Sequence, residues 1–360
     1  MKLRLLAVTV LLAAAGAVTI AAVRSARPRV LSEVGGRVLS PPTGSDRWVA
    51  WVEGDQEESR LMAARRHGGR PRVALIGRGL SGLAVAEDSA FVTRADESEE
   101  DEAGASLLRV DLRTGTSEAL ARLTTGAEQI AFGDGWLCWR EEREAALPEV
   151  PFVVAAAPLT VLRARSTNGS GDVHTLAIMG GRPGEGKGRA ELVGVAEAEA
   201  YWLERRTSGS SETTVFRRVA LPRGEPETLI REAGRRAAVL TQDALVWTAP
   251  SLEGAESNQF VAVKRRSLRN GAVKVIADWL STTGELQASH DEVYVQGRSW
   301  LWHLGSERGE QRRLRRRPGR FVTGRVVGDE QYLVLRSRDR LAVAARPLTW
   351  WSRIRSFIPL

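Results

Sequence analysis

Gly181, Gly186 and Lys187 have the spacing of a phosphate-binding loop, in which four residues separate two glycines and a lysine follows the second. That chemistry also needs a serine or threonine hydroxyl to bind Mg²⁺, and Gly188 stands in its place. It further needs a helix after the loop, whereas Leu192–Glu204 aligns with Leu83–Thr93 and is predicted to form two strands. We therefore predict a glycine-rich turn, with no nucleotide cofactor.

No other residues have the spacing of a known catalytic or metal-binding motif. The four histidines are far apart in the sequence, and neither a GxSxG elbow nor an HExxH motif is present. Cys138 is the single cysteine, which excludes an intramolecular disulfide. It lies beside Trp136 and Trp139 in an alternating segment, which predicts a buried structural thiol. The sequence thus assigns no catalytic residue, no metal and no cofactor.

Asp96–Glu102 reads DESEEDE and carries enough carboxylates to attract Ca²⁺. A calcium-binding loop alternates its ligands and holds a glycine at a fixed position, and this run does neither. It falls between two predicted strands, where a run of like charge is typical of a solvated loop. We predict an exposed loop.

The net charge of +8 is not concentrated in the way that a nucleic-acid-binding surface requires. Lys2, Arg4, Arg24 and Arg27 lie within residues 1–28, and the remainder carries 48 basic and 44 acidic residues, a net charge of +4. The body of the chain is therefore only mildly basic, and we expect no nucleic-acid partner.

Residues 1–28 have the composition of a segment that exports or anchors a protein. Leu5–Val23 is a run of 19 uncharged, mostly apolar residues, long enough to span a bilayer as a helix. Small residues at Ala15–Ala17 also fit a cleavable signal peptide. Either alternative places the remaining chain outside the cytoplasm. We expect a protein of the bacterial cell envelope, anchored in the inner membrane, or secreted or periplasmic if the segment is cleaved.

A repeat runs through the rest of the chain. An acidic turn followed by an apolar or aromatic strand occurs seven times, at Asp46, Asp88, Asp134, Glu199, Asp243, Asp291 and Asp329. These positions are 42, 46, 65, 44, 48 and 38 residues apart. A further pair of strands joined by a polar or glycine-containing turn follows, as in FVAVKRRSLRNGAVKVIAD from Phe260. Four strands in about 40–50 residues are the size of one propeller blade.

The sequence therefore predicts an all-β propeller of seven four-stranded blades over residues 29–346, with six blades as the alternative. An apolar helix in residues 1–28 precedes it, and a tail at 347–360 follows. The last unit has a third strand at Leu341–Pro347 and needs a fourth. The tail, Arg29–Val34 or Arg37–Ser40 could complete it and remove an exposed edge.

Aromatic residues recur on the second strands of the units. We predict that they fill the space between neighbouring blades rather than form an aromatic cage for a ligand. Examples are Trp51, Trp139, Tyr201, Trp247 and Tyr294.

The repeats resemble those of bacterial TolB-like and YWTD-type β-propellers. The resemblance covers most of the chain and is carried by Val246-Trp247-Thr248-Ala249 and Tyr201-Trp202-Leu203-Glu204. Ala249 stands where the YWTD pattern has its aspartate, and neither segment is a full match. The resemblance implies a propeller that binds proteins or peptides or acts as a scaffold, and it assigns no specific partner.

Two segments depart from the repeat, and one carries concentrated charge. The longest spacing contains an insertion near Arg143–Pro158 with an apolar centre. This insertion could plug the propeller mouth, pack against a partner or contact a membrane. The tail TWWSRIRSFIPL suits an interfacial helix or docking on the last blade. The basic run Arg312–Arg320 either protects an edge strand or binds an anionic partner. The candidate partner surface is Phe152, Val153, Val154, Trp350, Trp351, Arg315, Arg316 and Arg317.

We therefore expect an exported, membrane-anchored propeller that binds or scaffolds an envelope protein or peptide. One alternative is a propeller enzyme, such as a hydrolase or lyase, with its site in the central channel. Among the histidines, the repeat places only His290 near that channel. The other alternative is a module that binds anionic wall polymer or lipid through the arginine-rich edge.

Overall fold

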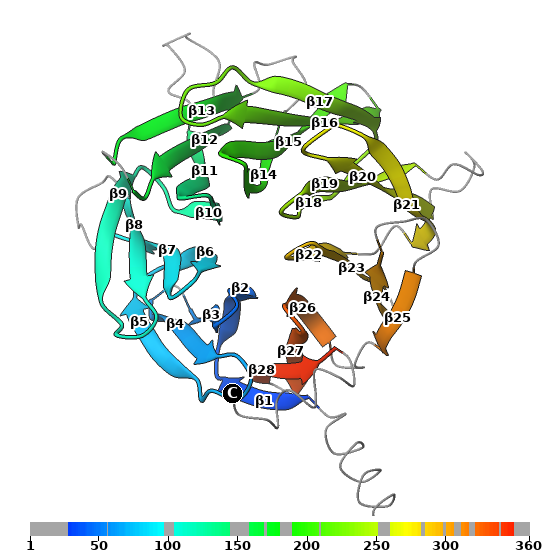
Figure 1. Cartoon of the computed structure of the whole chain (residues 1–360). Coiled ribbons are helices and arrows are strands. Elements are labelled where there is room, and N and C mark those ends of the chain that lie inside the picture. The colour runs from blue at the N-terminus through cyan, green and yellow to red at the C-terminus, as the bar shows by residue number, and fades with distance from the viewer. Residues whose placement is uncertain are drawn as a thin grey trace, which may run out of the picture.

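The computed structural model describes residues 28–348, apart from 56, 97–103, 145–157, 169–170, 181–188, 209, 251–259, 282–284, 298–299, 306–310, 317–320 and 338–339. These residues form seven four-stranded antiparallel sheets arranged around one axis (Figure 1). The prediction of an all-β propeller with seven blades is confirmed, and the alternative of six blades is wrong.

The strands of each blade follow one another from the axis outward. Blade 1 consists of β2 (Arg37–Gly44), β3 (Trp48–Gly54), β4 (Ser59–Arg65) and β5 (Arg72–Gly77). Blade 2 consists of β6 (Ser81–Ala86), β7 (Ser89–Ala95), β8 (Ala105–Asp111) and β9 (Ser117–Leu123). Blade 3 consists of β10 (Ala127–Gly133), β11 (Trp136–Glu144), β12 (Pro158–Ser166) and β13 (Val173–Gly180).

The later blades repeat this order, and the last one takes its outer strand from the N-terminal side. Blade 4 consists of β14 (Arg189–Ala196), β15 (Glu199–Ser208), β16 (Ser211–Ala220) and β17 (Glu227–Ala233). Blade 5 consists of β18 (Ala238–Leu240), β19 (Ala244–Pro250), β20 (Phe260–Ser267) and β21 (Val273–Ser281). Blade 6 consists of β22 (Glu285–Ser289), β23 (Glu292–Gln296), β24 (Trp300–Leu304) and β25 (Gln311–Arg316). Blade 7 consists of β26 (Phe321–Val327), β27 (Glu330–Ser337), β28 (Arg340–Pro347) and β1 (Arg29–Val34).

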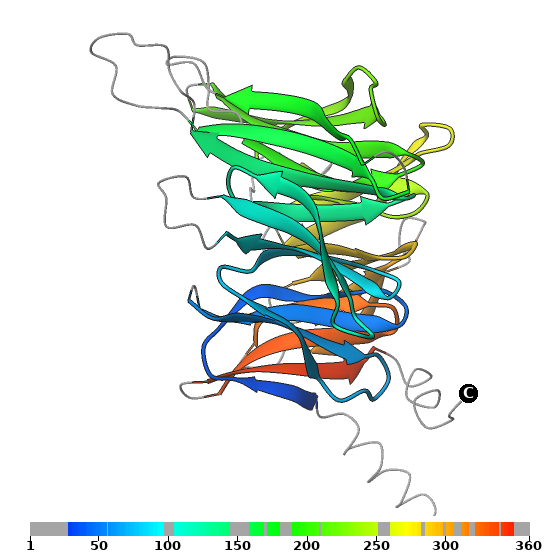
Figure 2. The ribbon, with the colours of Figure 1, turned by 90° about the vertical axis from the view of Figure 1, so that its left-hand side faces the viewer.

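The strand β1 closes the ring by pairing antiparallel with β28, from Arg29 opposite Ala345 to Val34 opposite Leu341. In the side view of Figure 2, the blue strand β1 lies against the red strand β28. The other candidate for closure, Arg37–Ser40, belongs to β2 and begins blade 1. The pairing covers an edge that would otherwise present unpaired N–H and C=O groups to another chain.

Apolar side chains fill the spaces between blades. Seven clusters of buried residues lie in the described part of the chain, and each joins two neighbouring blades. The predicted aromatic positions are buried in or beside these clusters, which confirms packing rather than an exposed cage. Their exposures are Trp51 0%, Trp139 0%, Tyr201 1%, Trp247 1% and Tyr294 6%.

Three of the second strands also bury a carboxylate two residues after a tryptophan. The indole Nε1 of Trp139 donates to Glu141 Oε1 at 2.7 Å, and Trp51 makes the same contact with Glu53 at 2.7 Å. Blade 4 repeats the arrangement between Trp202 and Glu204 at 3.3 Å. Glu141 is fully buried, so the indole donor supplies part of the hydrogen bonding that its charge needs. The Trp-x-Glu pattern therefore recurs on the second strands of blades 1, 3 and 4.

The first two strands of a blade are joined by a tight turn. At Asp134–Gly135 and Glu197–Ala198 both residues have positive φ, between 49° and 75°, as the type I′ turns of short hairpins require. The sequence repeat placed Glu199 at the turn of blade 4, and this is wrong by two residues because Glu199 begins β15. A strand repeats every two residues, so Glu197 and Glu199 fit the alternation equally well.

The glycine-rich segment that resembles a phosphate-binding loop joins blade 3 to blade 4. It begins after β13 ends at Gly180 and finishes where β14 begins at Arg189. Leu192–Glu204 forms parts of β14 and β15 with a turn between them. The prediction of two strands in place of a helix is confirmed, which removes the helix N-terminus that would hold a phosphate.

Several predicted features fall on residues outside the described part. They are the apolar run Leu5–Val23, most of the acidic run between β7 and β8, the centre of the insertion between β11 and β12, and the tail from residue 349. In the part of the chain that the structure does describe, no helix is long and apolar enough to cross a membrane.

Candidate functional site

The innermost strands of all seven blades surround a central channel. Its cavity measures about 970 Å³. The walls combine apolar residues such as Leu83, Ile130 and Phe132 with polar ones such as Ser289 and Arg325, and the surface they expose to the cavity is more polar than apolar. Phe132 is stacked on Phe91 with ring centroids 5.1 Å apart, which fixes its position in the wall. The size of this cavity lies in the range of ligand pockets.

The turns between first and second strands form one mouth of this channel. Each blade places at least one carboxylate at or directly beside its turn, so that acidic residues ring the mouth. One such residue per blade is Asp46, Asp88, Asp134, Glu197, Asp243, Asp291 and Asp329.

Several of these carboxylates hold the ring together. Trp48 Nε1 of blade 1 donates to Asp88 Oδ1 of blade 2 at 2.8 Å. The backbone N–H of Ala198 in blade 4 donates to Asp134 Oδ2 of blade 3 at 3.1 Å. Such contacts between neighbouring blades show that part of the acidic repeat is structural.

Asp243 is held within its own blade. Arg265 Nη2 lies 2.7 Å from both carboxylate oxygens, and Thr241 Oγ1 donates to Oδ1 at 2.9 Å. Burial acts to raise the pKa of Asp243, but the hydrogen bonds from Thr241 and Arg265 outweigh it and hold that pKa below its ordinary value. The carboxylate is therefore charged at neutral pH and occupied by its own blade.

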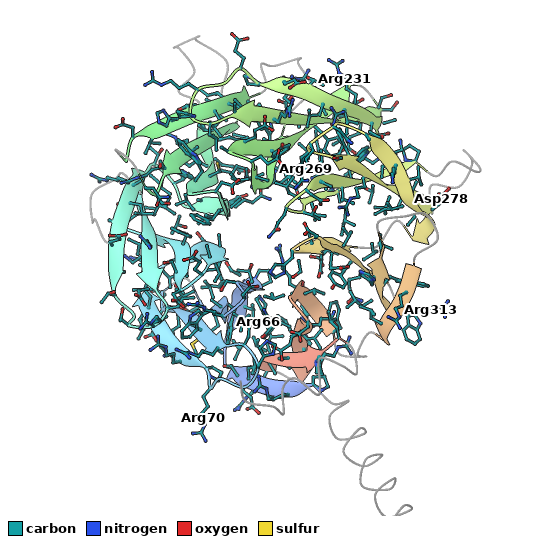
Figure 3. The ribbon with its side chains drawn as sticks, in the orientation of Figure 1. Arg66, Arg70, Arg231, Arg269, Asp278 and Arg313 are labelled. Atoms are coloured by element: carbon teal, nitrogen blue, oxygen red, sulfur yellow. The ribbon has the colours of Figure 1, made fainter. Side chains whose placement is uncertain are left out.

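A second group of charged side chains joins blade 1 to blade 7, where the ring closes. Arg66 is 9% exposed, and its Nη2 donates to Asp329 Oδ1 of blade 7 at 2.8 Å. Its Nη1 donates to the carbonyl of Asp46 at 3.1 Å. A Cβ on Gly328 would lie 2.2 Å from Arg66 Nη2, so a larger residue there would force this guanidinium group to move. Figure 3 shows Arg66 near the inner strands, whereas Arg70 from the same turn points away from the ring.

His290 of blade 6 lies at the same mouth and contacts Asp46 of blade 1. Its Nε2 lies 2.6 Å from Asp46 Oδ1, which joins blade 6 to blade 1 across the turn of blade 7. Its Nδ1 lies 3.5 Å from Ser289 Oγ, but that hydroxyl already accepts a hydrogen bond from the N–H of Gly328 at 2.7 Å. The arrangement offers one imidazole–carboxylate pair, and its serine is already bound to the next blade.

The described residues contain no group of three or more His, Cys, Asp or Glu side chains placed to hold a metal ion. The side chains of His290 and Asp46 are 47% and 74% exposed, so water screens their interaction. The chemistry available at the mouth is therefore hydrogen bonding and charge recognition, with His290 as the group that could accept or donate a proton.

The structure places the sequence-predicted surface residues away from this mouth or does not describe them. Phe152, Val153, Val154, Trp350, Trp351 and Arg317 lie outside the described residues. Arg315 and Arg316 lie on β25, the outermost strand of blade 6, opposite Leu301 and Trp300. The basic run thus begins on a blade edge, as predicted. Arg313 of that strand, labelled at the outer rim in Figure 3, lies over the Trp302 ring at 4.8 Å.

The residues of the channel mouth were only partly visible in the sequence. The repeat identified the turn carboxylate of six blades and placed that of blade 4 at Glu199 in place of Glu197, and register placed His290 near the channel. Arg66 was missed because it belongs to the turn between third and fourth strands, for which the repeat gives no position relative to the mouth. Its neighbours Asp329 and Asp46 are 263 and 20 residues away in the chain.

Cys138 is fully buried, as the sequence predicts. Burial in the blade raises the pKa of its thiol far above the ordinary value. We expect thiol reagents to leave the folded protein unmodified and to modify its single cysteine only after denaturation. Titration with a chromogenic disulfide, with and without urea, measures this. Stoichiometric reaction of the folded protein would contradict the buried assignment.

No family model matches the sequence, and no curated protein is significantly similar to it. Solved structures match the fold. Oligogalacturonate lyase in complex with manganese has a TM-score of 0.62 at 10% identity, over 88% of this chain and 90% of that one. An acylaminoacyl peptidase complex has a TM-score of 0.61 at 13% identity, and its match covers 88% of this chain but only 53% of the peptidase.

The β-propeller domain of the Trilobed protease from Pyrococcus furiosus has a TM-score of 0.58 at 12% identity, over 88% of this chain and 97% of that one. That domain is described as having an open velcro topology, whereas β1 closes the ring here. TolB from Acinetobacter baumannii also matches, at a TM-score of 0.45 and 14% identity. At these identities the likeness establishes the propeller fold, and the resemblance to TolB-like repeats stays at the level of the repeat.

Proposed function

We propose that the chain is a binding module of the bacterial cell envelope whose channel mouth takes an extended peptide segment of a partner protein. The observation that carries the proposal is the cavity of about 970 Å³, whose walls combine polar and apolar groups below a mouth with exposed carboxylates. The polar groups of the wall favour hydrogen bonds to a peptide backbone, and its apolar residues favour contact with aliphatic side chains. Exposed carboxylates such as Glu197 and Asp291 favour a basic flank on the ligand.

The proposal includes the location of the propeller. Leu5–Val23 would hold it in the inner membrane, with the ring outside the cytoplasm. Support comes from the length of the apolar run and from the basic residues before it.

Blocking the channel should abolish partner capture. Ala288 lies in the channel wall, so Ala288→Trp is expected to fill part of the cavity and lower capture at least about tenfold, the effect of losing a central contact. The measurement is a crosslinked pull-down of the full chain from envelope fractions, quantified by mass spectrometry.

Ala233→Trp is the matched control, because Ala233 is exposed on the outermost strand of blade 4. Capture of the same partners at the same level by both variants would show that the channel is not the binding site. A thermal unfolding curve for each variant separates loss of binding from loss of folding.

The pairing of His290 with Asp46 at 2.6 Å keeps an enzyme as the second candidate. A hydrolase or lyase would use that imidazole as a general base. Conversion of a captured peptide by the natural chain but not by His290→Gln, read by mass spectrometry, would favour the enzyme over the binding module.

A further inference from the structure

A cationic surface lies where blades 7 and 1 meet at the outer edge of the ring. Arg29 begins β1 and is exposed, and a Cβ built on Gly68 of blade 1 would lie 3.6 Å from its Nη1. Arg70, on the same turn as Gly68, is exposed and points away from the ring in Figure 3. Within the described residues, neither guanidinium has a hydrogen-bond or ion-pair partner. Both charges are therefore free to meet an external anion.

The outermost strands of the same two blades each carry an exposed aliphatic residue. Val30 follows Arg29 on β1 and is 55% exposed, and Val73 on β5 is 45% exposed. Glu33, farther along β1, is paired with Arg340 at 3.6 Å, which offsets its charge. Guanidinium groups and exposed aliphatic residues on adjoining edge strands are the composition of a surface that rests on lipid headgroups.

The described chain begins and ends at the same end of blade 7. Pro28 precedes Arg29, which pairs with Ala345, and the N–H of Leu348 donates to the carbonyl of Asp329 at 2.9 Å. Only residues 24–27 separate Pro28 from the apolar run Leu5–Val23, so Pro28 lies at most about 18 Å from Val23 along the chain. The tail that follows Leu348 carries two tryptophans and two arginines in its sequence. Two segments with membrane-compatible sequences therefore leave from the same end of blade 7.

We propose that the lipid-facing rim, formed by Arg29, Val30, Arg70 and Val73, binds the anionic headgroups of the membrane that holds the anchor. The inference rests on the proposed anchoring. The rim lies on the circumference of the ring, where blades 7 and 1 meet (Figure 1). Its arginines lie toward the end of these blades that carries the channel mouth, because Arg66, in the same turn as Arg70, donates to Asp329 and to the carbonyl of Asp46.

Cysteine accessibility in vesicles tests the rim. The full chain carrying Val30→Cys is reconstituted into phosphatidylglycerol or phosphatidylcholine vesicles and treated with a maleimide. Val273→Cys is the matched control, because Val273 is 50% exposed on the outermost strand of blade 5. The buried Cys138 does not interfere. We expect modification at position 30 to slow at least about fivefold in the anionic vesicles, the change that one arginine contributes near such a surface. Modification at position 273 should be unchanged.

Charge reversal tests the role of the arginines. The double variant Arg29→Glu and Arg70→Glu is expected to restore rapid modification of Val30→Cys in phosphatidylglycerol vesicles. The control pair is Arg113→Glu and Arg269→Glu, which are exposed arginines in the corresponding turns of blades 2 and 5. The control should leave position 30 protected.

Alkaline carbonate extraction distinguishes failure of the anchor from failure of the rim. A chain that resists extraction but shows equal modification at positions 30 and 273 overturns the rim and leaves the anchor standing. Release of the chain by carbonate would refute the anchor. Flotation of the released chain with phosphatidylglycerol vesicles then tests lipid binding by the rim. Flotation that is lost on charge reversal supports this binding, and absence of flotation overturns it.

Discussion

Replacing Val34 by aspartate is expected to lower the free energy of unfolding by about 3–5 kcal/mol, because it buries a charge without a partner. Val34 is 1% exposed and packs in the cluster between blades 7 and 1. It is also the last residue of β1 to pair with β28. The loss is a large fraction of the 5–15 kcal/mol that is typical of folded domains. Urea unfolding of the full chain in detergent, followed by far-ultraviolet circular dichroism, measures it.

The neighbouring Glu33 supplies the control for this variant. Its side chain is 69% exposed, and its ion pair with Arg340 spans 3.6 Å. Glu33→Ala should therefore change stability by no more than about 0.5 kcal/mol. If the aspartate variant does not fold, the free energy of unfolding can be measured on the milder variant Val34→Ala. An unfolding midpoint for both Val34 variants equal to that of the natural chain would show that β1 does not stabilise the closed ring.

The seven blades were predictable because each is a local structure. Its strands follow one another in the chain, so alternation and turn residues are enough to locate them. The strand that closes blade 7 could not be chosen from the sequence. Arg29–Val34 and Arg37–Ser40 alternate in the same way and are separated by only two glycines. Which of them pairs with β28 depends on contacts between residues about 310 positions apart, and no local pattern encodes that choice.

The channel mouth was harder to predict than the blades. The acidic repeat was visible, but the contacts that join blades were not: His290 meets Asp46 across 244 positions. The channel walls carry the same small and branched side chains as the spaces between blades. Since both environments accept apolar residues, the sequence does not distinguish a strand face that lines the channel from one that packs against the next blade.

Trp139→Phe is expected to destabilise the protein by about 3 kcal/mol, even though it keeps an aromatic ring in the cluster between blades 2 and 3. The smaller ring leaves a gap in a position that is fully buried. The variant also removes the indole N–H that Glu141 accepts at 2.7 Å, and Glu141 is itself fully buried. Arg163 Nε, 3.2 Å from the same oxygen, remains. Thermal and urea unfolding measure the loss.

Trp247→Phe separates the two causes. Trp247 is equally well buried, so phenylalanine leaves a similar gap, but its Nε1 donates to Glu232 at 3.0 Å. Lys264 Nζ lies 2.9 Å from that same carboxylate oxygen, and the Glu232 side chain is 12% exposed. Because the lysine and water still satisfy that carboxylate, the expected loss is about 1–2 kcal/mol. Equal losses for the two variants would mean that the lost volume accounts for both, and that the Trp-x-Glu pair of blade 3 contributes little as a hydrogen bond. A larger loss at Trp139 would identify the buried carboxylate as the reason why this strand needs tryptophan and not merely an aromatic residue.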